Sequence, residues 1–427
     1  MALANGPIAT RTIMRLAVFI NQFPGRVNTF FIRDMWALVQ AGVELDIFPI
    51  YPLDPDLWQY VPQTLLKEVM AHARVHHLGL RETLRLASQC PRHAYPDLLR
   101  SSVALLASAA RFGPRTMVKS AYVIPKAMAW AQQQHGSFDH ILAYWGNYAA
   151  TAAYFFQRLT NPDTPFSTFL HARIDLYNWQ AFLREKLLYA DNIFVVCEFN
   201  RQFVRQLYPD IFAQLNPKIH LYHLGLNLDE FPYTPEQRHP HTCLGVGRFD
   251  RHKGFGDLIR AAAILRERKI TLEVELIGAG DAAAELQALV AELNLGDQVR
   301  FLGWLPFDQV RATMRRATML VHASTKIGDA VPTVIKEAMA LGTPVIGTRV
   351  AGIPELLDQG RCGILIPPND APSLANAIER LVQDAQLRQH YGQASRLFAE
   401  QTFDARTNGQ YLAEVLRSTR RAAKPIG

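Results

Sequence analysis

A segment with three glycines and several basic residues follows a short apolar run: Gly245-Val-Gly247-Arg248-Phe-Asp-Arg-His-Lys253-Gly254. Glycines let backbone N–H groups come close to an anion. Arg248 and Lys253 add two positive charges, and the start of the following helix adds a favourable dipole. A diphosphate would suit such a site. A solvated basic turn is the alternative that this segment alone leaves open.

Two acids lie eight residues apart in the segment Asp329-Ala-Val-Pro-Thr-Val-Ile-Lys-Glu337. Pro332 is compatible with the first turn of a helix, where Thr333 and Val334 would offer free backbone N–H groups. Glu337 would then lie one turn further along, where its carboxylate could accept the two hydroxyls of a ribose. Asp329 would face the same cleft. The alternative is a helix whose N-terminus is simply stabilised by acids.

A third polar group ends an expected strand in the first half, where His171, Arg173 and Asp175 follow Phe169-Leu. Such side chains at a strand terminus could bind a polar ligand. The alternative, which we favour for Asp175, is a cap on the next helix. The segment from Met117 to Trp130 mixes two lysines with apolar and aromatic residues. It suits either a membrane surface or, as we favour, an ordinary helix against a core.

These residues need a scaffold, and the chain alternates short β-rich runs with amphipathic helices. That pattern predicts an α/β protein with parallel sheets covered by helices. Ligands of such sheets bind at the carboxyl ends of the strands, where all three polar groups lie. The expected strands are residues 16–21, 45–50, 140–144, 167–170, 193–197, 219–222, 243–246, 272–277, 299–302, 319–321 and 344–346.

The chain divides at a proline-rich linker. We expect an N-terminal domain over residues 1–225 with a helical insertion at about 81–134, the linker at 226–240, a C-terminal domain over 241–400 and a terminal helix or tail over 401–427. Its 427 residues are 49% hydrophobic and 19% charged, which excludes a largely disordered chain. The four cysteines are scattered and indicate small core residues in a reducing compartment.

The net charge of +7 is concentrated in the first half. Before Leu226 there are 21 basic and 15 acidic residues, against 24 and 23 from Leu226 onward. This favours an anionic surface or substrate near the first half, with dispersed solvated charge as the alternative. Nucleic acid is not favoured, because no basic block or binding motif is present. The sequence contains no apolar run of about 18 residues, so no membrane-spanning helix is predicted.

Taken together, the motifs resemble those of retaining glycosyltransferases of family 4. The likeness is strongest over about residues 242–357. Its most specific part is the pair Asp329 and Glu337, running into Glu337-Ala-Met-Ala-Leu-Gly-Thr-Pro-Val and Gly352-Ile-Pro-Glu-Leu. Segments of the first half after Gln22, around His171 and from Ala190 to Arg201 are similar to exopolysaccharide enzymes of the colanic-acid type. The family implies a GT-B fold of two Rossmann-like domains facing each other across a cleft, with C-terminal helices that can cross back to the first domain.

The resemblance also implies a role for each matching residue. Arg248 and Lys253 would hold the donor diphosphate and stabilise the leaving nucleotide, with Gly247 and Gly25 close to it. Glu337 would bind the ribose, and Asp329 would contact the donor sugar. The remaining implied contacts are Thr333 and Val334 through backbone N–H groups, His171 and Arg173 from the first half, and Trp304 and Leu305 near the base.

The implied reaction moves a sugar from a UDP- or GDP-sugar to a hydroxyl of a glycan, lipid-linked or small acceptor, with retention and without a metal or other cofactor. The implied location is the cytoplasm, with peripheral contact at the inner membrane face as an option. The chain has Asp329-Ala330 where the family usually has Glu-Gly. A catalytically weak nucleotide-sugar-binding subunit and a nucleotide-sugar epimerase are therefore kept as alternatives. A dinucleotide oxidoreductase is least expected, since no G-x-G-x-x-G follows a strand.

Overall fold

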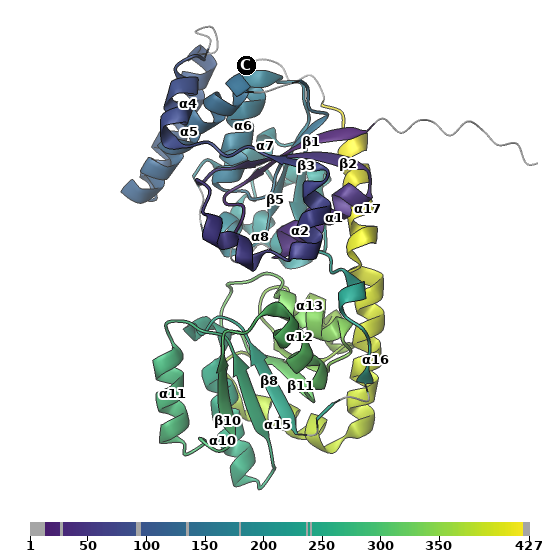
Figure 1. The fold of residues 1–427 in the computed structure, drawn as a ribbon. Helices are drawn as coiled ribbons and strands as arrows, with labels where there is room; N and C mark the ends of the chain where they lie inside the picture. The colour runs from purple at the N-terminus through teal and green to yellow at the C-terminus, as the bar shows by residue number, and fades with distance from the viewer. Residues whose placement is uncertain are drawn as a thin grey trace, which may run out of the picture. The chain divides into compact units, whose positions relative to one another are not determined.

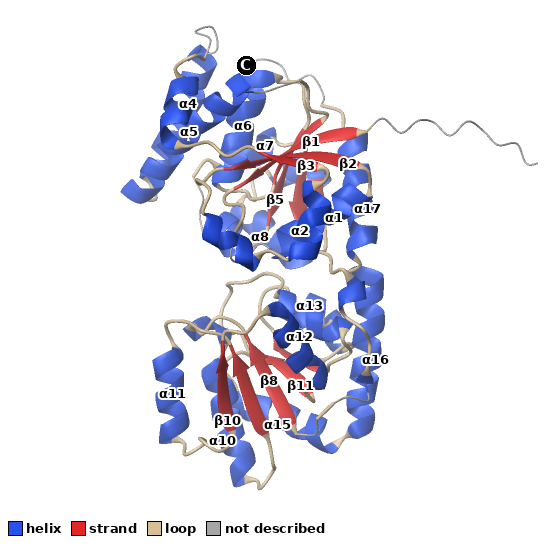
Figure 2. Ribbon diagram, in the orientation of Figure 1, coloured by secondary structure: helices blue, strands red, loops and turns tan. Residues whose placement is uncertain are grey.

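The computed structural model describes residues 13–25, 29–90, 95–133, 136–178, 181–235, 238–239 and 241–421. Their strands form two separate sheets, each flanked by helices (Figure 2). The chain separates into two compact units. Unit 1 contains Met1–Phe169, Ala181–Asn192 and Gly409–Gly427, and unit 2 contains Leu170–Gln180 and Ile193–Asn408. These divisions differ from the expected domain ranges, which stay a prediction.

The first sheet has seven strands in the order β3-β2-β1-β4-β5-β6-β7. The interior strand β1 pairs in parallel with β2 and β4, so that Leu16 lies opposite Leu45 on one side and His140 on the other. Nearly all of β1 is buried, as expected for a strand covered on both faces. The strands are β1 (Met14–Ile20), β2 (Val43–Pro49), β3 (Ala73–Val75), β4 (His140–Ala143), β5 (Phe166–Leu170), β6 (Asn192–Val195) and β7 (Ile219–Leu221).

Helices connect these strands and cover the sheet (Figure 1). The stretch expected as a helical insertion holds three of them, α3, α4 and α5, and both α3 and α4 pack against α5. The α-helices up to the second sheet are α1 (Thr29–Gln40), α2 (Gln63–Met70), α3 (Leu80–Ala87), α4 (Tyr95–Ala110), α5 (Pro114–Gln133), α6 (Tyr148–Thr160), α7 (Leu183–Tyr189), α8 (Glu198–Leu207) and α9 (Phe212–Leu215).

The second sheet lies within unit 2 and has six strands in the order β10-β9-β8-β11-β12-β13. Two apolar clusters cover its two faces: one is built from α10, α11 and α15, the other from α12, α13, α14 and α16. The strands are β8 (Thr242–Val246), β9 (Glu273–Ile277), β10 (Val299–Gly303), β11 (Met319–His322), β12 (Val345–Thr348) and β13 (Ile364–Ile366). The helices are α10 (Phe255–Glu267), α11 (Ala283–Glu292), α12 (Phe307–Arg316), α13 (Thr333–Ala340), α14 (Ile353–Leu356), α15 (Ala371–Gln383) and α16 (Ala385–Thr402).

The last helix, α17 (Ala405–Ser418), returns the chain to unit 1, where Figure 1 shows it beside α1. Arg417 donates to the carbonyl of Ala41 at 2.7 Å, and the buried ring of His140 contacts the carbonyl of Leu416 at 3.1 Å. Gly409 lets the two helices approach closely, because a Cβ there would lie 2.4 Å from the Cβ of Ala37. The expected crossing of the C-terminal helices is confirmed.

The predicted α/β class and most of the predicted strands are confirmed. Two strands were not expected, β3 and β13. Each has only three residues, and β3 is partly exposed, so neither gives the longer apolar run by which a buried strand is recognised. All four cysteines are free and buried, as expected of core residues.

Candidate active site

The carboxyl ends of β8 and β11 bring two of the predicted site residues together. The two strands are neighbours and run in parallel, so their C-terminal ends lie at the same edge of the sheet. Lys253 follows β8 in the short 3₁₀ turn η7 (Arg251–Lys253), and Asp329 follows β11. The Lys253 ammonium forms an ion pair with the Asp329 carboxylate. Residues 76 positions apart in the chain thus form one charged pair at the predicted place.

The glycines of this loop serve close backbone packing. Gly254 has a φ of +72°, and a Cβ at this position would lie 1.8 Å from the carbonyl oxygen of Ala323. A side chain there would push Lys253 away from the end of β11. The N–H of Gly247 donates to the carbonyl of Ile277 at 3.0 Å. The Gly247 N–H therefore ties the loop to β9, and the predicted contact of Gly247 with a diphosphate stays untested.

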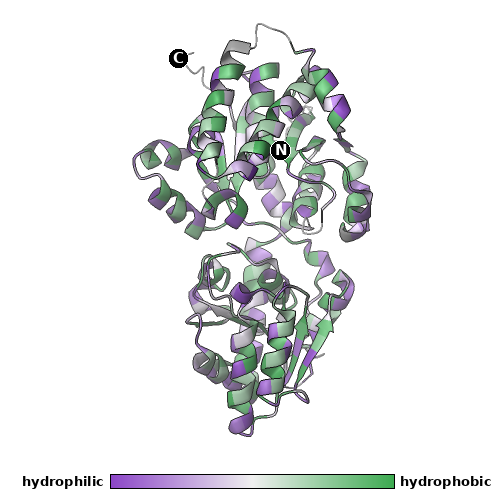
Figure 3. Cartoon of the chain, turned by 90° about the vertical axis from the view of Figure 1, so that its left-hand side faces the viewer, coloured by the Kyte–Doolittle hydropathy of each residue, from purple (hydrophilic) through white to green (hydrophobic). Residues whose placement is uncertain are grey.

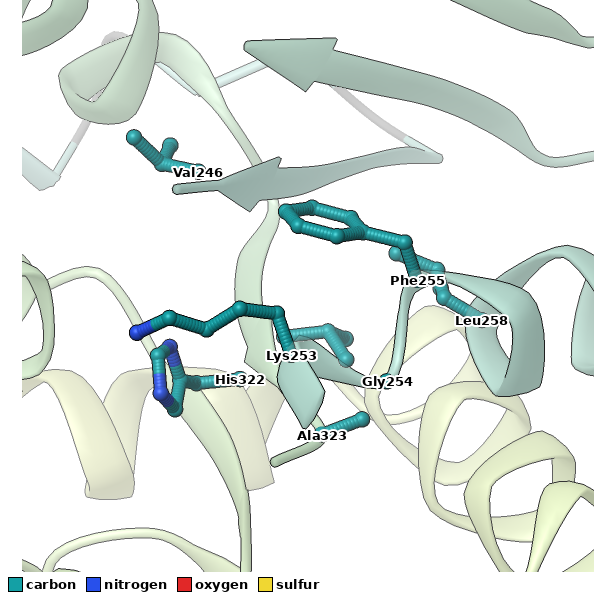
Figure 4. Close-up of a pocket in the computed structure, with 8 residues that line it drawn as sticks. Val246, Lys253, Gly254, Phe255, Leu258, His322 and Ala323 are labelled. Carbon is teal, nitrogen blue, oxygen red and sulfur yellow. The ribbon is translucent and has the colours of Figure 1, made fainter. Parts of the chain in front are cut away.

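His322, the last residue of β11, is part of the same site and was not singled out from the sequence. Figure 4 shows its ring next to the end of the Lys253 side chain, in a pocket whose other wall is formed by Val246 and Phe255. Burial lowers the pKa of His322 to about 3, and the positive charge of Lys253 acts in the same direction. The ring is therefore neutral at pH 7, and its Nε2 lies 3.0 Å from Ser324 Oγ. Its position at a strand end was the one available signal.

Asp329 and Arg248 carry charge at the more open side of the site. Burial alone would raise the pKa of the Asp329 carboxyl, but Lys253, His322 and Arg248 outweigh it, and the pKa is lowered. Asp329 is thus ionised at neutral pH. The Arg248 side chain is 69% exposed and makes an ion pair with Asp250 at 3.1 Å. Arg248 therefore has the reach to meet an anion entering from solvent.

The helix α13 starts one residue later than expected. Pro332 precedes the helix as its N-cap and accepts from the N–H of Ile335 at 3.1 Å, so the expectation that Pro332 lies in the first turn is wrong by one position. Thr333 and Val334 occupy the first turn, where N–H groups lack carbonyl partners within the helix. Glu337 follows one turn later and is half-buried.

The neighbouring Lys336 holds α13 in place through its buried side chain. Its side chain is fully buried and donates to the carbonyl of Leu224 at 2.6 Å. The Lys336 ammonium also lies 5.6 Å from the centre of the Phe403 ring. These contacts fix the rotation of α13 and hence the direction in which Glu337 points.

Trp304 and Leu305 follow β10 at the same edge of the second sheet. Gly303 turns the chain with a φ of +70°, and Trp304 is 62% exposed while Leu305 is half-buried. A large exposed indole at a strand end is suited to stacking on a base. The contact of Trp304 and Leu305 with a base stays a prediction.

The loop at His171 is held rigidly within unit 2. The Asp175 carboxylate accepts from the backbone N–H groups of His171 and Ala172, at 3.0 and 2.9 Å. The amide of Asn200 donates to the carbonyl of His171 at 2.8 Å. Asp175 lies at the third position of the short π-helix Arg173–Tyr177 and bonds back to the N–H groups that precede it, so the expectation that it caps the following helix is wrong.

The charge of Asp329 also acts on Tyr177 in this loop. The pKa of Tyr177 is raised by burial above all, and Cys197, Asp175 and Asp329 add to the effect. His171 itself is 4% exposed and Arg173 is exposed. Gly25 is buried in the loop after β1, in unit 1. Within the described residues, no group of three His, Cys, Asp or Glu side chains could hold a metal ion.

Comparisons with known proteins agree with this geometry. Residues 230–398 match the family model described as Glycosyl transferases group 1. Over 419 residues the chain is 26% identical to the amylovoran biosynthesis glycosyltransferase AmsK of Erwinia amylovora, covering 94% of this chain and 99% of that protein. A stretch of 168 residues is 34% identical to the D-inositol 3-phosphate glycosyltransferase of Pseudarthrobacter chlorophenolicus, covering 38% of this chain and 40% of that one.

Solved structures show the fold. The crystal structure of Anabaena Alr3699/HepE in complex with UDP-glucose matches with a TM-score of 0.67 at 18% identity, over 95% of this chain and 100% of that chain. The sucrose-phosphate synthase of Thermosynechococcus elongatus matches with a TM-score of 0.65 at 21% identity, over 95% and 98%. This chain therefore has the GT-B fold of two Rossmann-like domains and is a glycosyltransferase, and its residues 230–398 match the group 1 glycosyltransferase model.

Proposed function

We propose that the chain transfers a sugar from a nucleotide-sugar, a UDP- or GDP-sugar, to a hydroxyl of a glycan or lipid-linked acceptor in exopolysaccharide or glycoconjugate synthesis. The observation that carries the proposal is the Lys253–Asp329 ion pair beside the neutral His322. The biosynthetic role is supported by the likeness to AmsK over nearly the whole chain, and the choice of donor by the solved neighbour that holds UDP-glucose.

Lys253 suits the departing diphosphate. An ammonium has three N–H donors, and the pairing with Asp329 leaves capacity for phosphate oxygens. His322 is neutral, so it places no second positive charge that would repel Lys253. As the bond between sugar and phosphate breaks, negative charge grows on the leaving diphosphate, and a fixed cation lowers the barrier. Arg248 adds a second cation from the solvent side.

The departing diphosphate can also explain retention of configuration at the anomeric carbon. The departing phosphate takes the proton of the acceptor hydroxyl while that hydroxyl attacks the same face of the sugar. This step needs no nucleophile from the protein and no metal or other cofactor. Asp329 then positions the donor sugar, Glu337 holds the ribose, and the first turn of α13 offers the N–H groups of Thr333 and Val334 to the donor.

The carboxyl edge of the first sheet is suited to bind the acceptor. Tyr51 follows β2, and its N–H is bonded to the carbonyl of Asn21 after β1 at 2.9 Å. Tyr148 begins α6 after β4, and the Lys119 ammonium of α5 lies 5.8 Å from the Tyr51 ring centre and 6.0 Å from that of Tyr148. Burial raises the pKa of both phenols, which therefore keep their protons and can donate to sugar oxygens.

Release of free nucleotide from a panel of UDP-, GDP- and ADP-sugars tests the proposal. We expect one donor to be turned over and the turnover to be lost in Glu337→Ala. Glu292→Ala is the matched control, because Glu292 is an exposed acid at the end of α11. Turnover that survives in Glu337→Ala would contradict the assignment of the donor site.

A binding subunit without turnover is a second candidate, and one observation favours it. The shorter side chain of Asp329 is engaged with Lys253, so it is drawn toward the diphosphate side of the site rather than toward a sugar. Calorimetric titration with UDP and GDP separates the two functions. Tight binding without turnover of any donor, with candidate acceptors present, would favour the subunit.

A further inference from the structure

Exposed apolar side chains are concentrated on α3, α4, the turn after α4 and the start of α5, all in unit 1. Among the described residues, 16 large hydrophobic side chains are exposed, and seven of them fall within residues 80–118. A soluble monomer rarely exposes apolar side chains in a contiguous group, and such a group marks an interaction site. The seven are Leu80, Leu84, Leu99, Val103, Phe112, Met117 and Val118, each between 36% and 67% exposed.

Five of them lie on α4, in the turn that follows it and in the first turns of α5. Leu99 and Val103 are one helical turn apart on α4, and the exposed positions 107 and 110 continue their row toward the end of the helix. The row leads to the turn at Gly113, whose N–H bonds to the carbonyl of Ala110. Phe112 stands before that turn, and Met117 and Val118 follow it in the first turns of α5. We call these five residues the hairpin face.

The opposite sides of the same helices are buried. On α4, Leu105 is fully buried, and on α5 Val123 and Trp130 are at most 1% exposed. The C-terminal part of the Met117–Trp130 segment is therefore an ordinary core helix, as favoured from the sequence, while its N-terminal part faces outward. The exposed side chains of the hairpin face are not needed for the core of unit 1.

Three exposed arginines lie close in sequence to the hairpin face. Arg100 follows Leu99 on α4, Arg111 precedes Phe112 after the end of α4, and Arg115 lies in the first turn of α5. Within residues 80–118 there are six arginines and only two acids, Glu82 and Asp97. Figure 3, turned so that the side with α4 and α5 faces the viewer, shows hydrophobic and hydrophilic segments in close alternation along these helices.

We propose that the hairpin face binds an anionic lipid surface, entering the headgroup region with its apolar side chains while the arginines contact lipid phosphates. This inference rests on the proposed function, in which the acceptor is lipid-linked, and it supplies the surface for that encounter. Exposed apolar side chains that alternate along the chain with exposed arginines, with few acids, match a bilayer that offers hydrocarbon next to negative charge. Arginine stems cover apolar area while their charged ends stay in the polar layer.

The contact would be peripheral. No helix in the described part of the chain is long and apolar enough to cross a membrane. Binding should therefore be reversible and salt-sensitive, because surface charges are screened within about 10 Å at 0.1 M salt. Each arginine near an anionic surface contributes roughly fivefold to binding.

Co-sedimentation of the full chain with vesicles tests the proposal. We expect binding to vesicles of equal parts phosphatidylglycerol and phosphatidylcholine, little binding to pure phosphatidylcholine, and release by high salt. Leu99→Glu with Val103→Glu should reduce binding by at least about tenfold, and Arg100→Ala with Arg111→Ala by roughly 25-fold if both arginines contribute fully. Leu397→Glu is the matched control, because Leu397 is 56% exposed on α16 in unit 2. Circular dichroism checks that each variant is folded.

Three results would overturn the proposal: no binding to anionic vesicles, binding that the double glutamate variant leaves unchanged, or a lipid-independent dimer that this variant dissociates. The last would assign the hairpin face to contact between two copies. Nucleotide release without vesicles, measured on the same preparations, keeps this test separate from that of the proposed function. If the protein releases nucleotide but does not bind vesicles, only the proposal of lipid binding is refuted.

Discussion

The carboxyl edges of the two sheets have the same position in the fold and different chemistry. In the first sheet this edge carries phenols, with Tyr51 after β2 and Tyr148 after β4. In the second it carries the charged Lys253 and Asp329 beside a neutral His322. Parallel strands and helices determine where a ligand can bind, and side chains determine which ligand. Hydroxyls and rings suit a sugar, whereas a fixed ammonium suits a diphosphate.

Replacing Lys253 by alanine should have the largest effect on this contrast. The variant removes the ammonium at the charged edge, and a charge-assisted hydrogen bond contributes about 1.5–3 kcal/mol. We expect a fall in kcat of about 100-fold, with Asp329 remaining solvated because its side chain is half exposed. Steady-state nucleotide release measures it. Lys67→Ala, at an exposed lysine of α2, is the control, and a kcat within twofold of wild type in Lys253→Ala would refute a role for Lys253 at the diphosphate.

The charged edge could be predicted from the sequence better than the phenolic one. Arg248, Lys253, Asp329 and Glu337 lie in short segments with glycine or proline beside them, so local spacing alone indicates an anion site. His322 was not predicted as a site residue, because a histidine at the end of an apolar run cannot be distinguished from a core residue by sequence. Its significance depends on the pairing of β11 with β8, which only the fold shows.

The phenolic edge depends still more on tertiary structure. Tyr51, Lys119 and Tyr148 come from three distant segments with no common motif, and they meet only in the folded chain, where α5 packs against α6. That residues 81–134 are helical could be predicted from the sequence, but the side of each helix that is covered could not. Short strands such as β3 were missed for another reason: three residues are too few to show a strand pattern.

Buried histidines provide a second test, one that compares the stability of the two units. Burial lowers the pKa of His140 in unit 1 and of His322 in unit 2 to about 3 each. The unfolded chain binds a proton at each of them below pH 6.5, whereas the folded chain does not until about pH 3. Stability is therefore complete above pH 6.5 and falls as the pH is lowered toward 3.

We expect each of these histidines to cost roughly 2 kcal/mol between pH 8 and pH 5. His140→Gln should remove this loss from the unfolding of unit 1 and leave that of unit 2 unchanged. Urea unfolding at the two pH values, followed by fluorescence and by limited proteolysis of each unit, measures the difference. His72→Gln is the control, because His72 is exposed. An equal acid loss in wild type and His140→Gln would show that His140 is protonated in the folded chain.

Arg248→Ala should weaken the charged edge less than Lys253→Ala. The guanidinium is 69% exposed and already shares its charge with Asp250, so solvent screens its pull on a diphosphate. We expect kcat over KM for the donor to fall about tenfold, near the lower end of a charge-assisted contact. The matched comparison is Arg251→Ala, whose more exposed side chain pairs with Glu285 on α11. A loss as large as that of Lys253→Ala would mean that Arg248 folds over the bound donor and becomes desolvated.

The smallest expected effect belongs to the phenolic edge, and it separates the two edges most sharply. Tyr51→Phe removes one hydroxyl and keeps the ring under Lys119, so it should cost about one neutral hydrogen bond, roughly threefold in KM for the acceptor. Nucleotide release by hydrolysis without an acceptor should not change, because the donor site lies on the other sheet. Tyr391→Phe on α16 serves as the control. A change in acceptor-free release would show that Tyr51 acts on the donor, and the division between a sugar-binding and a diphosphate-binding edge would then be lost.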